Sequence, residues 1–255
     1  MNKLSKILIV FLSLVSVANS ITRKDIKIIE SAENIRYLSQ ELVKEYLLYY
    51  KYSNSINIIE KSSTLLDKLN NNLKIIAITT KDRDTKDILE FLAYSRDQID
   101  DIIKEPTSKD NVLLMLDYGE TFIEGANSIT NKYKYDLSKE EEMLVLTKKT
   151  EFYINRATKY YIADNIGFNS ETNRKNMQKT LINIAYNMKR INDYPYPYDL
   201  EIEVSKINLA LSKIKPFLES TKENNRVFIP VLILISTKYI DNIMSILSLY
   251  HTQNQ

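Results

Sequence analysis

Apolar side chains recur every three or four residues along most of the chain, which is the spacing that lines one face of an α-helix. In an early segment these positions are Ile28, Ala32, Ile35, Leu42, Tyr46 and Tyr49, and in a later one they are Leu200, Val204, Ile207, Leu211, Ile214 and Leu218. The pattern predicts helices near residues 25–52, 56–79, 84–104, 110–133, 138–166, 170–191, 199–220 and 225–250. With only 3 Gly and 5 Pro in 255 residues, the composition also favours long helices, so we expect an all-α fold.

Polar and proline residues mark several of the predicted helix ends. Asp82 and Asp84 are suitable capping residues before the third helix. Pro106 ends that helix, because proline has no backbone N–H to donate and restrains the residue before it. Ser138 followed by Glu141 matches a capping box at the start of the fifth helix.

The connections in the second half carry similar marks. Gly167 can adopt the left-handed turn that ends the fifth helix, with Asn169 or Ser170 capping the sixth. Residues 194–198 read Tyr-Pro-Tyr-Pro-Tyr, and each residue before a proline avoids the helical region, so this segment must be extended. It could be a rigid connector or a recognition patch, and the connector is the more common use of such a segment.

The two halves of the chain share one apolar pattern when they are offset by about 115 residues. Matched pairs include Leu66 with Leu181, Leu69 with Ile184, Leu89 with Val204, Leu92 with Ile207 and Ile99 with Ile214. Agreement over successive segments at one offset predicts an internal repeat. Because short links favour antiparallel neighbours, we expect two tandem up-and-down four-helix bundles, at residues 21–135 and 136–255.

The first twenty residues have the three parts of a secretory signal peptide. Lys3 and Lys6 supply a positive start, residues 7–18 form a short apolar core, and small residues at Ala18 and Ser20 suit a signal peptidase. We expect residues 1–20 to be cleaved near Ser20, which gives a periplasmic or otherwise exported protein. An uncleaved N-terminal membrane anchor is the alternative, although the apolar run is shorter than the roughly 20 residues of a comfortable span.

Charge and residue content exclude several classes of function. The formal net charge of +2 comes from the two leader lysines, so the mature chain is neutral, and we expect no nucleic-acid partner. With no cysteine and with the single histidine, His251, far from other candidate ligands in sequence, we expect no metal site and no cofactor. No phosphate loop or hydrolase motif occurs, and neighbouring carboxylates such as Asp100 and Asp101 point apart on a helix. We therefore expect a protein that is not an enzyme and has no catalytic residue.

A short motif opens the first predicted helix. Its residues are Arg36, Leu38, Ser39 and Gln40. The motif resembles the start of the PilJ-type sensory domain, which occurs at the N-terminus of type IV pilus chemotaxis transducers and in nitrate sensor kinases of the NarX type. That family begins with arginine, methionine, leucine, serine, glutamine and arginine; here Tyr37 replaces the methionine and Glu41 the second arginine. The resemblance extends over nearly all of the mature chain as two tandem copies.

The resemblance implies an extracytoplasmic helical sensor in which an arginine contacts an anion. The corresponding ligand-binding residues here are Arg36, Ser39 and Gln40, together with Arg156, which keeps the second arginine in the second copy. A guanidinium group offers a fixed fork of donors that suits a planar oxyanion. Glu151 replaces the first arginine of the second copy, and Glu41 would lie near Arg36, so both departures weaken this interpretation. The alternative for Arg36 is an ion pair with Glu33 or Glu41 on the helix surface.

Two kinds of function remain open. The first is an exported sensory or binding module that takes a small ligand, such as an anion, or a partner protein of the envelope. The second is a structural or adaptor protein of the cell envelope with no small-molecule ligand, which would have filled bundles and a large exposed apolar patch. The outward helix faces could also pair with a second copy, which would give a homodimer.

Overall fold

The computed structural model describes the backbone of residues 3–52, 56–133, 137–219 and 228–255, and the side chains of these ranges from residue 24 onward apart from 56–59. These residues form eight helices and no strand, which confirms the all-α prediction. The helices are α1 (Lys3–Tyr52), α2 (Ile56–Thr79), α3 (Arg83–Lys104), α4 (Lys109–Lys132), α5 (Lys139–Asn165), α6 (Glu171–Asn192), α7 (Tyr198–Glu219) and α8 (Pro230–Gln253).

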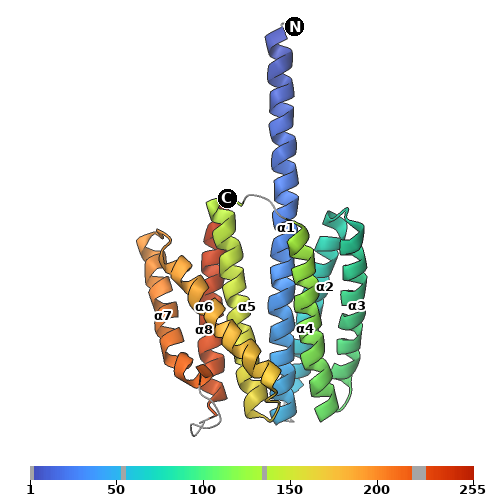
Figure 1. Ribbon diagram of the computed structural model, residues 1–255, viewed down its shortest axis with the longest axis vertical. Coiled ribbons are helices and arrows are strands. Elements are labelled where there is room, and N and C mark those ends of the chain that lie inside the picture. The colour runs from blue at the N-terminus through green and yellow to red at the C-terminus, as the bar shows by residue number, and fades with distance from the viewer. Residues whose placement is uncertain (1–2, 53–55, 134–136, 220–227) are drawn as a thin grey trace.

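The predicted start of the first helix at residue 25 is wrong, because α1 runs without a break from Lys3. No proline or glycine interrupts the chain between these two points, so nothing local stops the helix. The first turns of α1 extend beyond the other helices (Figure 1). The predicted leader, residues 1–20, falls where no side chain is described, and the predicted helix limits at residues 220 and 225 also lie outside the described residues.

The predicted helix ends have the expected local causes. Asp82 caps α3 by accepting the backbone N–H of Thr85 at 2.7 Å. At α5, the Ser138 hydroxyl accepts from the backbone N–H of Glu141 at 3.2 Å, and the Glu141 carboxylate accepts from the backbone N–H of Ser138 at 2.8 Å, so the capping box is confirmed.

The connection from α5 to α6 is also as predicted. Gly167 has a φ of 104°, in the left-handed region that a side chain disfavours, and it follows the last turn of α5. Of the two candidate caps for α6, the structure uses Ser170, whose hydroxyl accepts from the backbone N–H of Asn173 at 3.1 Å. The sequence of this short connection therefore reverses the chain by local geometry alone.

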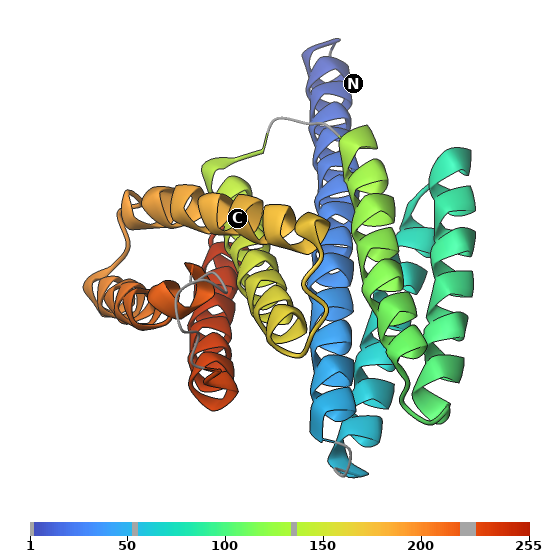
Figure 2. The same ribbon diagram turned by 60° about the horizontal axis from the view of Figure 1, so that its bottom comes forward.

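The helices pack around two central ones, α1 and α5, which lie against each other (Figure 1). Among the first four helices, α1 contacts α2 and α4, and α3 contacts the same two from the outside. Among the last four, α5 contacts α6 and α8, and α7 packs mainly on α8. However, α6 runs obliquely across α5 and meets α7 at few residues (Figure 2). A wedge of space therefore separates α6 from α7.

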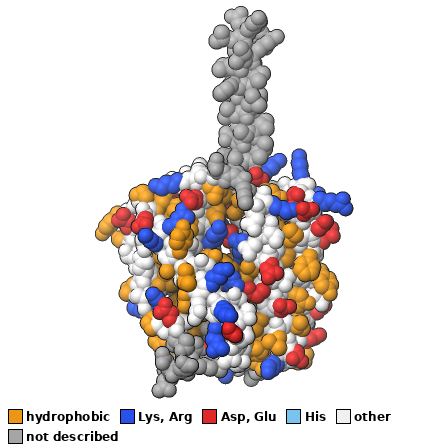
Figure 3. All heavy atoms as spheres, viewed as in Figure 1, with side chains coloured by type: hydrophobic (Ala, Val, Ile, Leu, Met, Phe, Trp, Pro, Cys, Tyr) orange, Lys and Arg blue, Asp and Glu red, His pale blue; other side chains and the backbone are white. Residues whose placement is uncertain are grey.

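Buried apolar side chains from all eight helices form one continuous core. At the contact between α1 and α4, a Cβ atom added to Gly119 would lie 2.7 Å from Cγ2 of Val43. Glycine at this position therefore lets α4 approach α1 closely. On the face shown in Figure 3, charged side chains of both signs are interspersed with hydrophobic ones.

Among the described residues, one helix is long and apolar enough to cross a membrane by length and composition: α8, with a mean hydropathy of 1.4 over its most apolar window. Its inner face, with Ile233, Ile240 and Met244 fully buried, packs on α5 and α7. A core helix and a membrane span share this composition, so the packing of α8 is the more specific observation.

Candidate functional site

Buried polar side chains are concentrated on α1 and α5, where these two helices meet each other and α4. Gln40, Asn155 and Lys159 have no exposed surface, and Lys44 is 4% exposed. Buried polar groups need partners to offset their lost hydration. The hydrogen bonds described below therefore hold the centre of the molecule together, and they also fix the side chains that line its cavities.

Arg36 lies at the contact of α1 with α4 and is only 7% exposed. Its Nη1 donates to the carboxylate of Glu33, one turn earlier, and its Nη2 donates to Oδ1 of Asn127 and, at 3.1 Å, to Oγ1 of Thr130 on α4. The expected pairing with Glu33 is thus present, but inside the protein rather than on the surface. Nε of Arg36 is buried and has no hydrogen-bond partner among the described residues.

Arg156 lies on α5 and reaches across to α4. Its Nη2 donates to Oε2 of Glu120 at 2.6 Å and to the Tyr160 hydroxyl at 3.0 Å. The guanidinium carbon also lies 5.7 Å from the ring centre of Phe152, a cation–π distance. Lys159 Nζ donates to Oε1 of Glu120 at 2.7 Å, so one carboxylate receives two cations.

The charges around Glu120 shift its own ionisation and that of Lys159. Burial opposes ionisation of Glu120, but the charges of Lys159 and Arg156 outweigh it and lower the pKa of this carboxyl. Burial lowers the pKa of Lys159 to about 8, against the opposing charge of Glu120. These helices are therefore joined by a charged cluster that depends on its single carboxylate.

Arg36 and Arg156 line the same small cavity, which lies among α1, α4, α5 and α6 and has a volume of about 160 Å³. The ten residues around it are Arg36, Ile123, Asn127, Phe152, Tyr153, Arg156, Asn176, Lys179, Thr180 and Asn183. Three of them are basic, five more carry amide or hydroxyl groups, and none is acidic. Liquid water occupies about 30 Å³ per molecule, so the cavity has room for a small oxyanion with a few waters. We call it the cationic cavity.

Neither carboxylate that pairs with the two arginines lines the cationic cavity. Glu33 and Glu120 contact their arginines from elsewhere, so the cavity itself meets guanidinium, ammonium, amide and hydroxyl groups. Such donors suit an anion that accepts several hydrogen bonds. Lys179 is exposed on α6.

The other two residues expected to bind the ligand, Ser39 and Gln40, do not line this cavity. The Ser39 hydroxyl donates to the backbone carbonyl of Arg36 at 2.8 Å. Nε2 of Gln40 donates to the Ser39 hydroxyl and to the backbone carbonyl of Gly119, each at 3.2 Å. The structure therefore brings Arg36 and Arg156 together and places Ser39 and Gln40 in the packing of α1 against α4.

The two acidic residues that weakened the anion interpretation lie elsewhere. Glu41 pairs with Lys44 and with Lys61, at 3.4 Å for the second pair, and not with Arg36. Glu151 accepts from the Ser245 hydroxyl at 3.1 Å, and burial raises its pKa to about 7. Neither side chain faces the cationic cavity.

Sequence reasoning did not find the side chains that complete the cavity. Asn127 on α4 and Asn176, Lys179 and Asn183 on α6 come from helices that carry none of the motif residues. The three α6 residues do recur at three- and four-residue spacing on one helical face, so a polar stripe was visible in the sequence. Nothing in the sequence indicated that this stripe faces α1 and α4.

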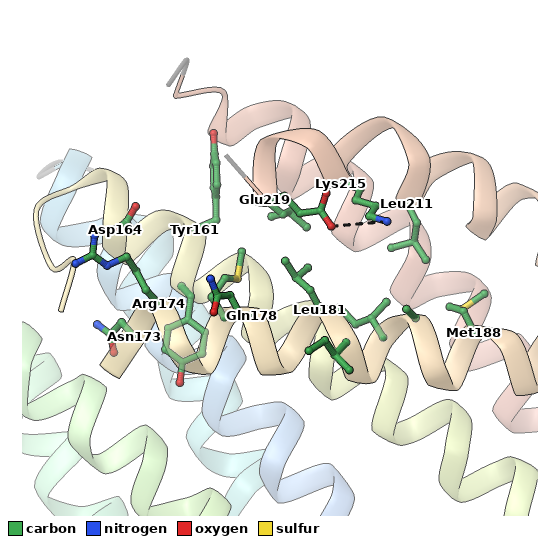
Figure 4. Close-up of a pocket in the computed structure, with 16 residues that line it drawn as sticks. Tyr161, Asp164, Asn173, Arg174, Gln178, Leu181, Met188, Leu211, Lys215 and Glu219 are labelled. Atoms are coloured by element: carbon green, nitrogen blue, oxygen red, sulfur yellow. Dashed lines mark ion pairs between the residues drawn. The ribbon is translucent and has the colours of Figure 1, made fainter. Parts of the chain in front are cut away.

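A second and larger cavity fills the wedge between α6 and α7, with the end of α5 as its floor (Figure 4). Its volume is about 710 Å³. Most of its wall is apolar, and the main apolar residues are Met177, Leu181, Ile184, Met188, Leu211 and Leu218. It shares no residue with the cationic cavity, and α6 contributes opposite faces to the two.

A third polar group spans α1, α5 and α8. Lys44 Nζ donates to Oδ1 of Asn155 at 2.7 Å, and Nδ2 of Asn155 donates to the Asp241 carboxylate. Burial raises the pKa of Asp241 to about 7, although Lys44 opposes the shift. In the part of the chain whose side chains are described, no group of His, Asp and Glu residues could hold a metal ion. These titratable groups link three helices.

Comparisons with known proteins do not place this arrangement in a family. No protein-family model matches the chain, and the searches of curated proteins and of solved structures found no match. The geometry of the cationic cavity, of the apolar cavity and of the exposed faces therefore provides the grounds for a functional conclusion.

Proposed function

We propose that this protein is an exported, non-enzymatic binding module of the PilJ-like sensory type, and that the cationic cavity holds a small oxyanion. The observation that carries the proposal is the meeting of Arg36, Arg156 and Lys179, from three different helices, around one cavity without an acidic residue.

The arrangement fits a recognition site that is already formed. Glu33 and Asn127 hold Arg36, while Glu120 and Tyr160 hold Arg156, so neither guanidinium must give up rotamer freedom when a ligand enters. Planar guanidinium groups match planar or tetrahedral oxyanions, such as nitrate or sulfate, by paired donors. The tandem repeat, with bundles at residues 21–135 and 136–255, belongs to the same proposal: it gives α1 and α5 equivalent places, and the site forms where these equivalent helices meet.

Ligand binding in this cavity would change how the surrounding helices pack. The cavity is lined by α1, α4, α5 and α6, so an anion that draws the three basic side chains together would favour closer packing of both halves. The protein would then act on another protein of the envelope, or deliver its ligand to one.

One observation favours the second candidate, a structural or adaptor protein. The outer face of α8 carries exposed apolar side chains at helical spacing, namely Val231, Ile235, Tyr239, Ile246 and Leu249. Exposed apolar patches of this kind mark protein interfaces. A partner protein or a second copy could cover this face with no ligand in the cationic cavity.

The test is thermal unfolding of the purified protein with nitrate, sulfate, phosphate, acetate and chloride at one ionic strength. A ligand that binds only the folded state raises stability by about 2.7 kcal/mol at one hundred times its dissociation constant. We expect one oxyanion to raise the unfolding temperature above chloride. Lys179→Gln should remove most of this shift, whereas Lys175→Gln, on the same helix but outside the cavity, should leave it unchanged.

A second variant tests the arginine directly. Replacing Arg36 alone would leave Glu33 buried without a partner, so the double variant Glu33→Gln with Arg36→Gln removes both charges and leaves neither unpaired. It should fold and lose the oxyanion shift. If every anion behaves like chloride in well-folded protein, the sensor proposal fails and the adaptor becomes the better explanation.

A further inference from the structure

The wedge between α6 and α7 differs from the corresponding place in the first half. There, α2 and α3 pack against each other, and Leu66, Leu69 and Ile99 are buried between their neighbours. In the second half α6 turns across α5 and leaves α7 supported mainly by α8. Apolar side chains that would otherwise meet across this contact instead face an open volume of about 710 Å³.

The wall of this cavity is suited to an apolar chain. Met177, Leu181, Ile184 and Met188 follow one another along α6, and Leu211 and Leu218 face them from α7 (Figure 4). Ligand cavities in proteins commonly have volumes of about 300–1,000 Å³ and mostly apolar walls with a few polar groups. Two of the six side chains are methionines, whose flexible thioethers adapt to irregular ligands.

Charged groups lie at two parts of the cavity. Asn173, Arg174 and Gln178 stand on the first turns of α6 with Asp164 of α5 beside Arg174, and Lys215 stands with Glu219 near the end of α7 (Figure 4). Lys215 lies 3.7 Å from Glu219, and both side chains are largely exposed, so this pair is weak. Arg174 is exposed and is the basic side chain at the α6 end of the cavity.

We propose that this cavity binds a single-chain amphiphile with an anionic head, such as a medium-chain carboxylate. Its hydrocarbon chain lies along the apolar wall between α6 and α7, and its head lies beside Arg174. The site is separate from the cationic cavity, because the two share no lining residue. Binding covers apolar surface that is otherwise exposed to water.

The first experiment uses N-phenyl-1-naphthylamine, an uncharged dye that fluoresces in apolar surroundings. We expect its fluorescence to rise with the purified protein and to fall as dodecanoate is added below its micellar concentration. Ala185→Trp, which fills the cavity from an exposed position of α6, should weaken both ligands at least tenfold. Leu209→Trp, on an exposed face of α7 outside the cavity, should leave both affinities unchanged.

The head is tested by comparing dodecanoate with dodecanol. Arg174→Gln should weaken dodecanoate at least fivefold and leave dodecanol unchanged, whereas Lys175→Gln should change neither. Three results would overturn the proposal. They are no rise in dye fluorescence, a dye affinity that Ala185→Trp does not change, and equal affinities of the wild-type protein for dodecanoate and dodecanol. A dimer that light scattering detects, and that Ala185→Trp dissociates, would also overturn it, since a second copy would then occupy the wedge.

Discussion

The side-chain amide of Asn155 on α5 donates to both carboxylate oxygens of Asp241 on α8, at 2.8 and 3.0 Å. The same amide accepts a hydrogen bond from Lys44 on α1 through its oxygen, at 2.7 Å. Asn155 is fully buried and relays between a buried cation and a partly buried carboxylate that do not touch. One neutral side chain thus connects the helix at the centre of each half with the last helix of the chain.

Replacing this relay should be costly. Asn155→Ala leaves Lys44 and Asp241 each short of a hydrogen-bond partner inside the protein, and an unmet buried polar group costs about 1–3 kcal/mol. We expect the free energy of unfolding, measured in urea, to fall by about 2–4 kcal/mol. The matched control is Asn208→Ala, which removes an exposed hydrogen bond to Asn192 and should change stability by less than about 0.5 kcal/mol. Equal losses in the two variants would contradict the relay.

The carboxyl of Asp241 should also make stability depend on pH. Burial raises its pKa to about 7, with Lys44 opposing and Glu41 and Glu151 reinforcing the shift, and the Tyr37 hydroxyl faces the same carboxyl at 3.4 Å. The folded state therefore keeps a proton that the unfolded state loses above about pH 4. The stabilisation from this carboxyl is complete below its pKa in the unfolded chain and is lost as the pH rises through its pKa in the folded protein. Its full size is about 1.4 kcal/mol for each unit by which the two pKa values differ.

Asp241→Asn isolates this contribution from those of other groups. Urea unfolding at pH 5 and pH 8 should show that the variant gains stability relative to wild type as the pH rises. The exposed Asp101→Asn variant should show the same difference from wild type at both pH values. If Asp241→Asn also behaves in that way, its carboxyl does not titrate between these pH values in the folded protein.

The helices could be predicted from the sequence because their causes are local. The three- and four-residue apolar spacing fixes where a helix can bury one face, and Asp82, Ser138 and Gly167 fix where particular helices begin or end. The start of α1 is the exception, since no proline or glycine breaks the helix between residue 3 and the predicted start at residue 25. The oblique course of α6 has no comparable local mark, because it depends on how its whole face packs against α5.

The candidate site could be predicted only in part. Arg36 and Arg156 stood out by their place in a motif, but their common cavity depends on the rotation of α1 and α5 about their axes. Nothing in the sequence singled out Lys159 or Asp241. Each is held by partners more than 35 residues away in sequence, such as Glu120 and Asn155. Periodicity describes one helix at a time and therefore cannot reveal such pairs.

Glu120 is a second position where a small change should have a large effect. Among the described residues, Glu120 is the only carboxylate that forms ion pairs with both Arg156 and Lys159. Lys159 is fully buried. Glu120→Gln keeps the shape but leaves two cations without a counter-charge, and breaking such a pair costs about 3–5 kcal/mol when it is deeply buried. Because the Glu120 side chain is 31% exposed, we expect a smaller loss of about 2 kcal/mol in urea unfolding at pH 7.

The neighbouring Glu124 provides the control for this substitution. It lies one turn later on α4 and is exposed, so Glu124→Gln should change stability by less than about 0.5 kcal/mol. Equal stabilities for the two variants would mean that solvent, and not Glu120, compensates the charge of Lys159.

His251 gives the last prediction, because it is the only histidine in the chain and its imidazole can be followed by NMR without assignment. The ring is fully buried, with Nδ1 2.7 Å from Oε2 of Glu140 and Nε2 2.8 Å from the Tyr196 hydroxyl. Burial lowers its pKa, although Glu140 opposes the shift. We expect the imidazole to titrate below its ordinary value of about 6.5.

The role of Glu140 can be separated from that of burial. Glu140→Gln removes the charge that favours the imidazolium, so the pKa of His251 should fall further. Glu171→Gln, on a different helix, should leave the pKa unchanged.

Tyr196 belongs to the tyrosine–proline segment, so the buried hydroxyl contact makes that segment a connector that ties the start of α7 to the end of α8. An imidazole that titrates at about 6.5 both in the wild type and in Glu140→Gln would show that the ring is solvated and that this tie is open in solution.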